Sequence, residues 1–329
     1  MKDISAMRII AIITATLLTV TFLARSAHAE SFQVWQQGFK VKAVAAGVSP
    51  EWFEKAMQGV EPIERVIELD GKQPEHKITF EQYKKNVISQ TRIDKGRELY
   101  KQHYNELKDL EKIYGVAPQY VIALWGIETN FGGYTGGFQV IDSLATLAWD
   151  GRRRAFFEKE LINALKISQD GHISLKDMKG SWAGAMGQNQ FMPSSFLAYA
   201  VDSNNDGKRD IWTDTSDVFA STSNYLKTNG WTAGEKWGRQ VYLTQPIAKS
   251  LTGPKIKKSL SFWKELGVQT LTGKPLPTVD GMMASLVQPD GPEGPSYLAY
   301  NNYQSIMHWN RSTYFATSVG LLADLIAKQ

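Results

Sequence analysis

The sequence predicts a mainly α-helical (α+β) fold, in which a helical body carries a small β insertion. Apolar residues recur at three- and four-residue spacings through most of residues 30–230, which is the period of amphipathic helices. From about residue 236, short β-prone pieces alternate with glycine, proline and serine, which indicates a small sheet. The chain has 329 residues, 43% of them apolar, so it is long enough to bury a substantial core.

Each expected element follows from its local pattern and its flanking residues. Residues 97–114 place apolar side chains on one face, and Gly115 ends this helix. Pro118 suits the first turn of the next helix, which runs to Thr129. Further helices are expected at 153–167, 218–228, 303–308 and 314–327, strands at 239–243, 277–279 and 282–287, and a loop at 289–295.

Residues 1–29 have the pattern of a secretory signal. Lys2 and Arg8 give a positive start, residues 9–23 form an apolar run, and Ala27-His28-Ala29 matches a cleavage site. The apolar run is shorter than the roughly 20 residues of a spanning helix, and no later stretch is long and apolar enough to cross a bilayer. We expect a cleaved signal and a periplasmic protein without a lipid anchor; the alternative is an uncleaved membrane anchor.

Composition and missing motifs exclude several function classes. The absence of cysteine excludes disulfides, thiolate metal sites, a cysteine nucleophile and a lipid anchor on cysteine. The formal net charge of +4 is not concentrated in a basic run, so we expect no nucleic-acid partner. The histidines form no HExxH pattern, and there is no P-loop, dinucleotide fingerprint or GxSxG elbow. Carboxylate chemistry remains.

Glu128 is the candidate for that chemistry. It is the one charged residue in the run 123–132, at the end of an otherwise apolar helix. A carboxyl group that loses solvent there should have a raised pKa, as a general acid requires, and the negative end of the helix dipole acts weakly in the same direction. The alternative is a carboxylate that caps or pairs structurally in the core.

Residues 179–194 are rich in glycine, alanine and uncharged polar side chains. Glycine allows close backbone approach, and Ser181, Gln188, Asn189 and Gln190 can bond neutral hydroxyls and amides. This lining suits a carbohydrate better than a phosphate. Tight helix packing is the alternative interpretation of the same composition.

Residues 202–210 match the first three-quarters of an EF-hand calcium loop. Asp202, Asn204 and Asp206 stand at positions 1, 3 and 5, with Gly207 at position 6. Position 12 is Thr213 where a glutamate is expected, and Asp214 and Asp217 lie beyond it, where they could close a longer loop. We expect a structural calcium ion; the alternative is an Asx-rich turn without metal.

Six separated segments together resemble the lytic murein transglycosylase B family, glycoside hydrolase family 103. The resemblance runs from about Phe32 to the C-terminus, in the order that the family requires. Its segments are residues 114–118, 123–132, 142–147, 184–195, 202–212 and 309–320.

The resemblance implies a lysozyme-like helical core with a flanking helical domain and a small β domain. The expected parts are about 30–115 for the flanking domain, 116–235 for the core with its calcium loop, 236–290 for the β domain, and 291–329 for the return to the core. It also implies cleavage of the β-1,4 bond between N-acetylmuramic acid and N-acetylglucosamine in peptidoglycan. The family reaction uses no water and leaves a 1,6-anhydromuramic acid end.

The resemblance assigns roles to residues of this chain. The catalytic glutamate of the family matches Glu128. Its substrate-lining residues match Tyr83, Ser181, Gln190 and Asn310, and its calcium ligands match Asp202, Asn204, Asp206, Lys208 through the carbonyl, and Asp217 as the closing carboxylate. Two departures stand out: His308-Trp309-Asn310 replaces an Arg-Tyr-Asn run, and Phe315 with Tyr314 beside it replaces a tyrosine. Trp309 and Tyr314 are therefore added as candidate subsite residues.

A single acid suffices if the nucleophile belongs to the substrate. Protonated Glu128 would donate to the glycosidic oxygen, and its carboxylate would then take the proton of the muramic acid C6 hydroxyl, which closes on C1. A hydrolytic muramidase needs a second carboxylate, for which Asp142 and Glu160 are candidates, although each is more simply structural. The other alternative is a non-catalytic, calcium-stabilised protein that binds peptidoglycan.

Overall fold

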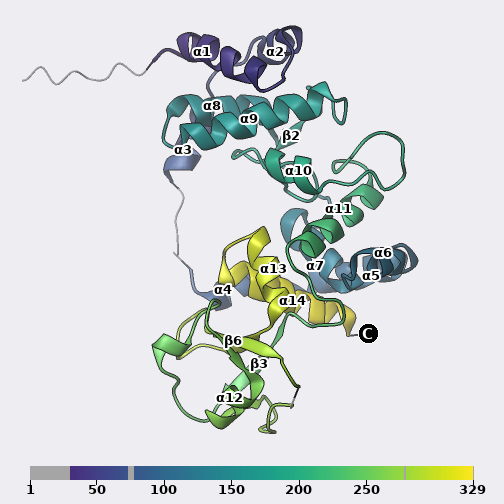
Figure 1. Ribbon diagram of the computed structural model, residues 1–329, viewed down its shortest axis with the longest axis vertical. Coiled ribbons are helices and arrows are strands. Elements are labelled where there is room, and N and C mark those ends of the chain that lie inside the picture. The colour runs from purple at the N-terminus through teal and green to yellow at the C-terminus, as the bar shows by residue number, and fades with distance from the viewer. Residues whose placement is uncertain (1–29, 73–77, 278, 329) are drawn as a thin grey trace, which may run out of the picture.

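The computed structural model describes residues 30–72, 78–277 and 279–328. The predicted signal sequence, residues 1–29, lies outside them. Figure 1 shows a helical body with a small sheet at one end. The helices are α1 (Phe32–Ala45), α2 (Pro50–Met57), α3 (Glu64–Gly71), α4 (Phe80–Val87), α5 (Gln90–Gln102), α6 (Tyr104–Tyr114), α7 (Pro118–Thr129), α8 (Val140–Asp150), α9 (Arg154–Gln169), α10 (Pro193–Tyr199), α11 (Thr215–Thr228), α12 (Leu260–Glu265), α13 (Asn301–Trp309) and α14 (Thr313–Ala327).

Helix α7 forms the centre of the helical body. It begins with Pro118 at its first position and is buried on nearly every side, as expected for a helix that is apolar all round. It packs on α5, α6, α11 and α14. The helix ends at Asn130, whose backbone is left-handed, so the chain turns sharply directly after Glu128 and Thr129.

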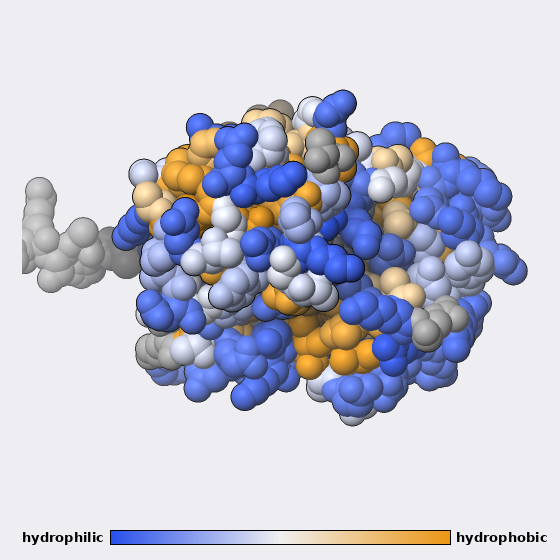
Figure 2. Space-filling model, turned by 90° about the horizontal axis from the view of Figure 1, so that it is seen from below, coloured by the Kyte–Doolittle hydropathy of each residue, from blue (hydrophilic) through white to orange (hydrophobic). Residues whose placement is uncertain are grey.

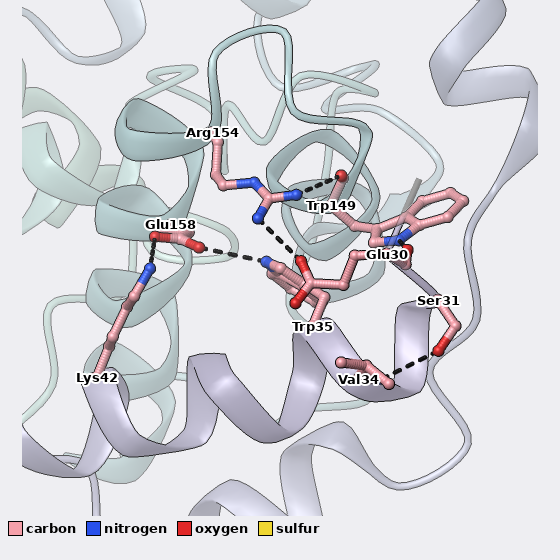
Figure 3. A network of polar contacts seen from close by, with 8 residues as sticks. All are labelled: Glu30, Ser31, Val34, Trp35, Lys42, Trp149, Arg154 and Glu158. Carbon is pink, nitrogen blue, oxygen red and sulfur yellow. Dashed lines mark hydrogen bonds and ion pairs between the residues drawn. The ribbon is translucent and has the colours of Figure 1, made fainter. Parts of the chain in front are cut away.

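Helix α1 is anchored on α9 at the far end of the body from the sheet (Figure 1). Glu158 accepts hydrogen bonds from Trp35 Nε1 at 3.2 Å and from Lys42 Nζ at 2.7 Å. Figure 3 shows a second ion pair beside it, between Arg154 and Glu30, at 3.0 Å. The charge of the buried Glu158 is thus paired with Lys42 of α1, and this contact holds α1 against α9.

The sheet has five antiparallel strands in the order β4-β6-β7-β3-β5. The sheet has its own core, around Trp263, Leu286 and Leu298, which is separate from the core of the helical body.

Figure 2 views this end of the molecule, where hydrophilic residues predominate and apolar patches show between them. The strands are β3 (Gly238–Leu243), β4 (Lys257–Ser259), β5 (Val268–Thr270), β6 (Met283–Val287) and β7 (Ser296–Ala299); β1 (Phe138–Gln139) and β2 (Lys179–Gly180) pair separately in the helical body.

The fold class predicted from the sequence is confirmed, with two corrections to its elements. The helix expected over 97–114 is broken at His103, which ends α5 and precedes α6. The strand expected at 277–279 is wrong, because Pro277 and Val279 lie outside any strand. Strands β4, β5 and β7 were not predicted, since three or four residues are too short to show a period.

Packing crosses the domain boundaries expected from the resemblance. Helix α5 packs on α7 and α14, α3 packs on α8, and β7 joins the sheet although it lies beyond residue 290. The proposed division into 30–115, 116–235, 236–290 and 291–329 stays a prediction. In the part of the chain that the structure describes, no helix has both the length and the apolar character needed to cross a membrane.

Candidate active site

Glu128 lies in the last turn of α7, at the edge of the buried core. Part of its surface stays open to solvent, while protein surrounds the rest. Burial raises the pKa of the Glu128 carboxyl to about 7, and a hydrogen bond from Trp309 opposes this rise. The sequence predicted a raised pKa for this group, and the structure confirms that direction. A carboxyl that holds its proton near neutral pH can act as a general acid.

Trp309 contacts this carboxyl directly. Its indole Nε1 donates a hydrogen bond of 2.8 Å to Glu128 Oε1. The ring is held by its neighbours, with centroids 5.1 Å from Phe191 and 4.7 Å from Tyr225. Trp309 therefore orients the acid, a role that the sequence did not predict for it.

Gln188 fixes the end of α7 against two other segments. Its Oε1 accepts a hydrogen bond of 2.8 Å from Trp125 Nε1, and its Nε2 donates one of 2.9 Å to the carbonyl of Trp212. Its own carbonyl accepts from the Thr129 hydroxyl at 3.1 Å. A Cβ at Gly132 would meet Gln188 Oε1 at 2.3 Å, so a glycine is required there. In the sequence Gln188 is one polar residue among several, and the glycines near it are the signal of this close packing.

Ser181 and Gln190 lie on a tightly folded segment after β2. The Ser181 hydroxyl accepts a hydrogen bond from Ala185 N at 3.0 Å, and Gln190 Nε2 donates to the carbonyls of Thr135 and Gly187. Both side chains are partly exposed. A hydroxyl and a carboxamide oxygen with capacity for further hydrogen bonds suit hydroxyl and amide groups of a ligand.

Tyr83, on α4, reaches the surroundings of Glu128. Burial and, secondarily, the charge of Glu128 raise the pKa of Tyr83 to about 12, while Arg92 opposes this. The rings of Tyr83 and Tyr314 lie 5.8 Å apart. Tyr314 packs in turn at 5.4 Å from Phe80, and its hydroxyl donates to Asp290. Tyr83 and Tyr314 thus form an aromatic pair between α4 and α14.

Asn310 follows Trp309 and is exposed. Its Oδ1 accepts a hydrogen bond of 3.1 Å from Ser312 N, just before α14 begins. Within the described residues, its Nδ2 makes no hydrogen bond. The predicted site residues thus fall into three groups. Trp309 is hydrogen bonded to Glu128 and is followed by Asn310. Ser181 and Gln190 lie on one segment, and Tyr83 packs against Tyr314.

The two candidate second carboxylates have different surroundings. Glu160 is buried and accepts a hydrogen bond of 2.8 Å from Ser194 N, at the start of α10. It serves as a structural anchor for that helix. Asp142 lies in the first turn of α8, and burial raises its pKa. Neither is hydrogen bonded to Glu128.

Four of the five predicted calcium ligands lie on the loop between α10 and α11, and the fifth, Asp217, lies in the first turn of α11. Asp202 accepts hydrogen bonds from Asp206 N and Gly207 N, and Asn204 Oδ1 accepts one of 2.9 Å from Asp206 N. Asp217 is buried at the start of α11, where it accepts bonds from the backbone of Ser203 and Asp210. Burial raises the pKa of Asp217, and the nearby charges of Asp214 and Asp202 add to this.

The donor atoms on this loop are of the chemical type that calcium binds. They are carboxylate and amide oxygens, with the carbonyl of Lys208 on the same loop, and calcium prefers such oxygen ligands. Asp217 already binds two backbone N–H groups. Among residues 30–72, 78–277 and 279–328, no three His, Cys, Asp or Glu side chains are grouped as metal ligands. A bound ion would therefore depend on amide and carbonyl oxygens as well as on the acids.

Comparison with known proteins identifies the family. The chain matches the family model described as Transglycosylase SLT domain over residues 31–324. It is 34% identical over 247 residues to the membrane-bound lytic murein transglycosylase B of Escherichia coli (strain K12). This alignment covers 74% of the chain and 66%, just under two thirds, of that relative.

Solved structures give the same family. SltB3 from Pseudomonas aeruginosa, in complex with NAG-NAM-pentapeptide, is 42% identical, with a TM-score of 0.88, over 91% of this chain and 80% of that one. The same protein is also known with NAG-anhNAM-pentapeptide. The Escherichia coli lytic transglycosylase Slt35, in complex with calcium, is 30% identical, with a TM-score of 0.77, over 89% of this chain and 92% of that one. The chain therefore belongs to the transglycosylase SLT family.

Proposed function

We propose that this protein cleaves the β-1,4 bond between N-acetylmuramic acid and N-acetylglucosamine without water, and leaves 1,6-anhydromuramic acid ends in cell-wall turnover. The observation that carries the proposal is the Glu128 carboxyl, whose pKa burial raises to about 7 while Trp309 holds it in place. SltB3 is known in complex with NAG-anhNAM-pentapeptide, which supports the anhydro product.

Glu128 acts in both halves of the reaction. In the protonated form it donates its proton to the glycosidic oxygen as the C1–O bond breaks. The resulting carboxylate then takes the proton of the C6 hydroxyl, whose oxygen forms the new bond to C1. The acid is regenerated in this step, so no second carboxylate is consumed. An intramolecular nucleophile of this kind can have an effective molarity of ~10⁵ M or more, which lowers the barrier substantially.

The remaining site residues would bind and orient the sugars. Ser181, Gln190 and Asn310 offer hydroxyl and carboxamide groups for N-acetyl groups and hydroxyls, and Tyr83 offers a ring face for stacking. Trp309 and Tyr314 extend these aromatic surfaces. The partly exposed positions of these side chains support this role.

A hydrolytic muramidase on the same scaffold would need a carboxylate opposite Glu128 to activate water. Glu160 is a poor candidate, because its carboxylate already holds the start of α10. Asp142 lies half-buried in the first turn of α8, where burial raises its pKa, and it makes no hydrogen bond to Glu128. The surroundings of these two carboxylates favour attack by the C6 hydroxyl of the substrate over attack by an activated water.

Mass spectrometry of the soluble products tests the reaction. The protein is incubated with purified peptidoglycan, and anhydro ends, one water lighter than reducing ends, are expected. Glu128→Gln should lose at least ~10³-fold in rate, since the general acid is removed, while Glu293→Gln, which changes an exposed acid, should keep it. Reducing ends would support the muramidase, and binding without any release would support the non-catalytic alternative.

We also propose a structural calcium ion on the loop of Asp202, Asn204, Asp206 and Lys208, with Asp217 as the closing carboxylate. The Slt35 structure in complex with calcium supports it. The ion would offset the repulsion among the clustered acids of the loop, and it takes no part in bond cleavage.

The periplasm is the proposed location, because the glycan strands of peptidoglycan are the proposed partner and residues 1–29 have the pattern of a secretory signal. Fractionation of cells that express the full chain tests this. Recovery of a shortened protein in the periplasmic fraction is expected. Recovery with the membrane at full length would favour the uncleaved anchor.

A further inference from the structure

Asp290 holds the start of helix α4 from the side of the sheet. It lies in the loop between β6 and β7, and its two oxygens accept hydrogen bonds from Phe80 N at 2.5 Å and Glu81 N at 3.2 Å. These N–H groups have no partner within the helix, and a negative charge is favoured at this end of the helix dipole. A residue more than 200 positions away in the sequence thus caps α4.

The same carboxylate also contacts α14. Tyr314 donates its hydroxyl to Asp290 Oδ1 at 3.3 Å, and the Tyr314 ring lies 5.4 Å from Phe80. Asp290 therefore joins three segments: the β6–β7 loop, the first turn of α4 and the first turn of α14. Figure 1 shows α4 beside α14, at the end of the helical body that carries the sheet.

Tyr83 stands one turn after Phe80 on the same short helix. Residues three apart share a helix face, so a shift at Phe80 moves Tyr83 with it. Tyr83 packs at 5.8 Å from Tyr314, and the charge of Glu128 acts on its hydroxyl. An eight-residue helix is too short to be stable by itself, so its contacts decide where it lies.

We propose that Asp290 is a positioning residue for the reaction, because it fixes the helix that carries the candidate subsite residue Tyr83 against Tyr314. Asp290 does not touch the sugar in this role. It acts through Tyr83, and its contribution should disappear when the Tyr83 side chain is absent. This inference rests on the proposed function of the site.

A double-mutant cycle tests the proposal. The rate of glycan release, as kcat and KM, is measured for the wild type, Asp290→Ala, Tyr83→Ala and the double variant. Asp290→Ala is expected to lower kcat/KM about 10-fold or more, since small displacements near reacting groups cost up to ~10²-fold. In the Tyr83→Ala background, Asp290→Ala should lower kcat/KM less than 2-fold further. Losses that simply multiply would overturn the proposal, because they would show that Asp290 does not act through Tyr83.

Two further variants keep this test decisive. Glu293→Ala removes an exposed acid from the same loop and should leave kcat/KM unchanged. Asp290→Asn keeps the shape and one acceptor oxygen, so it should fall between the wild type and Asp290→Ala, and it takes the place of Asp290→Ala in the cycle if that variant fails to fold by circular dichroism. Glycan release is counted whichever end forms. A wild type that forms no anhydro ends contradicts the proposed function, whereas independent losses in the cycle contradict the role of Asp290 alone.

Discussion

The indole of Trp309 donates a hydrogen bond of 2.8 Å to the carboxyl of Glu128, although the two residues are 181 positions apart in the sequence. This bond favours the charged form of Glu128 and so opposes the rise in pKa that burial causes. The acid is thus held at about 7 by two opposing effects. A site of this kind can give up its proton and take one back near neutral pH.

Trp309→Phe removes the donor and keeps most of the ring. The pKa of Glu128 should then rise further, so the decline of kcat/KM with increasing pH should move to higher pH. The rate itself should fall by about 10-fold, because the carboxyl loses its orientation. Rates measured from pH 5 to pH 9 check this. Trp149→Phe is the matched control, since its indole bonds the carbonyl of Glu30, far from the site; equal profiles in both variants would contradict the prediction.

Glu128→Gln should make the protein more stable at pH 8. The pKa of Glu128 is raised from its ordinary 4.5 to about 7, so the unfolded chain releases its proton first as pH rises. Folding stability therefore falls between pH 4.5 and 7 in the wild type, and the neutral glutamine avoids this loss. We expect a higher Tm than the wild type at pH 8 and no difference at pH 4. Melting curves of the variant and the wild type at both pH values test this prediction. A variant that melts below the wild type at pH 8 contradicts the raised pKa.

Gln188→Ala should destabilise the protein and slow the reaction together. The buried indole N–H of Trp125 would lose its acceptor, and an unsatisfied buried donor costs about 1–3 kcal/mol. Because α7 is then less firmly held, kcat should fall as well. Urea unfolding and kinetics measure both effects. Gln139→Ala, which removes an exposed amide contact at 3.3 Å, should change the free energy of unfolding by less than ~0.5 kcal/mol, and an equal effect of the two substitutions would refute the role of Gln188.

Calcium should raise the melting temperature of metal-stripped protein. Binding at a hundredfold excess over Kd adds about 2.7 kcal/mol to the free energy of unfolding. Asp202→Asn and Asp206→Asn should remove this response, because each replaces a charged ligand by a neutral one. Asp109→Asn, at an exposed ion pair with Lys112, is the control and should retain it. If the Tm measured with chelator equals the Tm measured with calcium, the loop is an Asx-rich turn without metal.

Much of the helical body could be predicted from its apolar spacing. Residues 118–129 match α7 because Pro118 and the turn after Thr129 define both ends. The break at His103 could not be predicted, since Leu99 and Leu107 are buried on both sides of it and keep the same apolar period. The short strands depend on partners distant in the sequence, such as Val241 opposite Ser296 in β3 and β7.

The site was predictable where one residue carries the chemistry. Glu128 stands out as a charge in an apolar run, and its raised pKa follows from that setting. The contacts of Trp309 and Asp290 could not be predicted, because each joins segments whose approach depends on the whole fold. Gln188 was visible as a polar residue among glycines, but only the structure shows which groups its amide binds.

The amide of Gln188 couples the local unfolding of two segments. Its two ends bind the helix of the acid through Trp125 and the calcium loop segment through the carbonyl of Trp212. When either segment opens, it loses its hydrogen bond to this shared amide, and the amide is then held less firmly against the other segment. Backbone hydrogens in both segments should therefore exchange with solvent as one cooperative unit. A cation that stiffens the loop would, by the same connection, reduce the fluctuations of the acid without coming near the sugar.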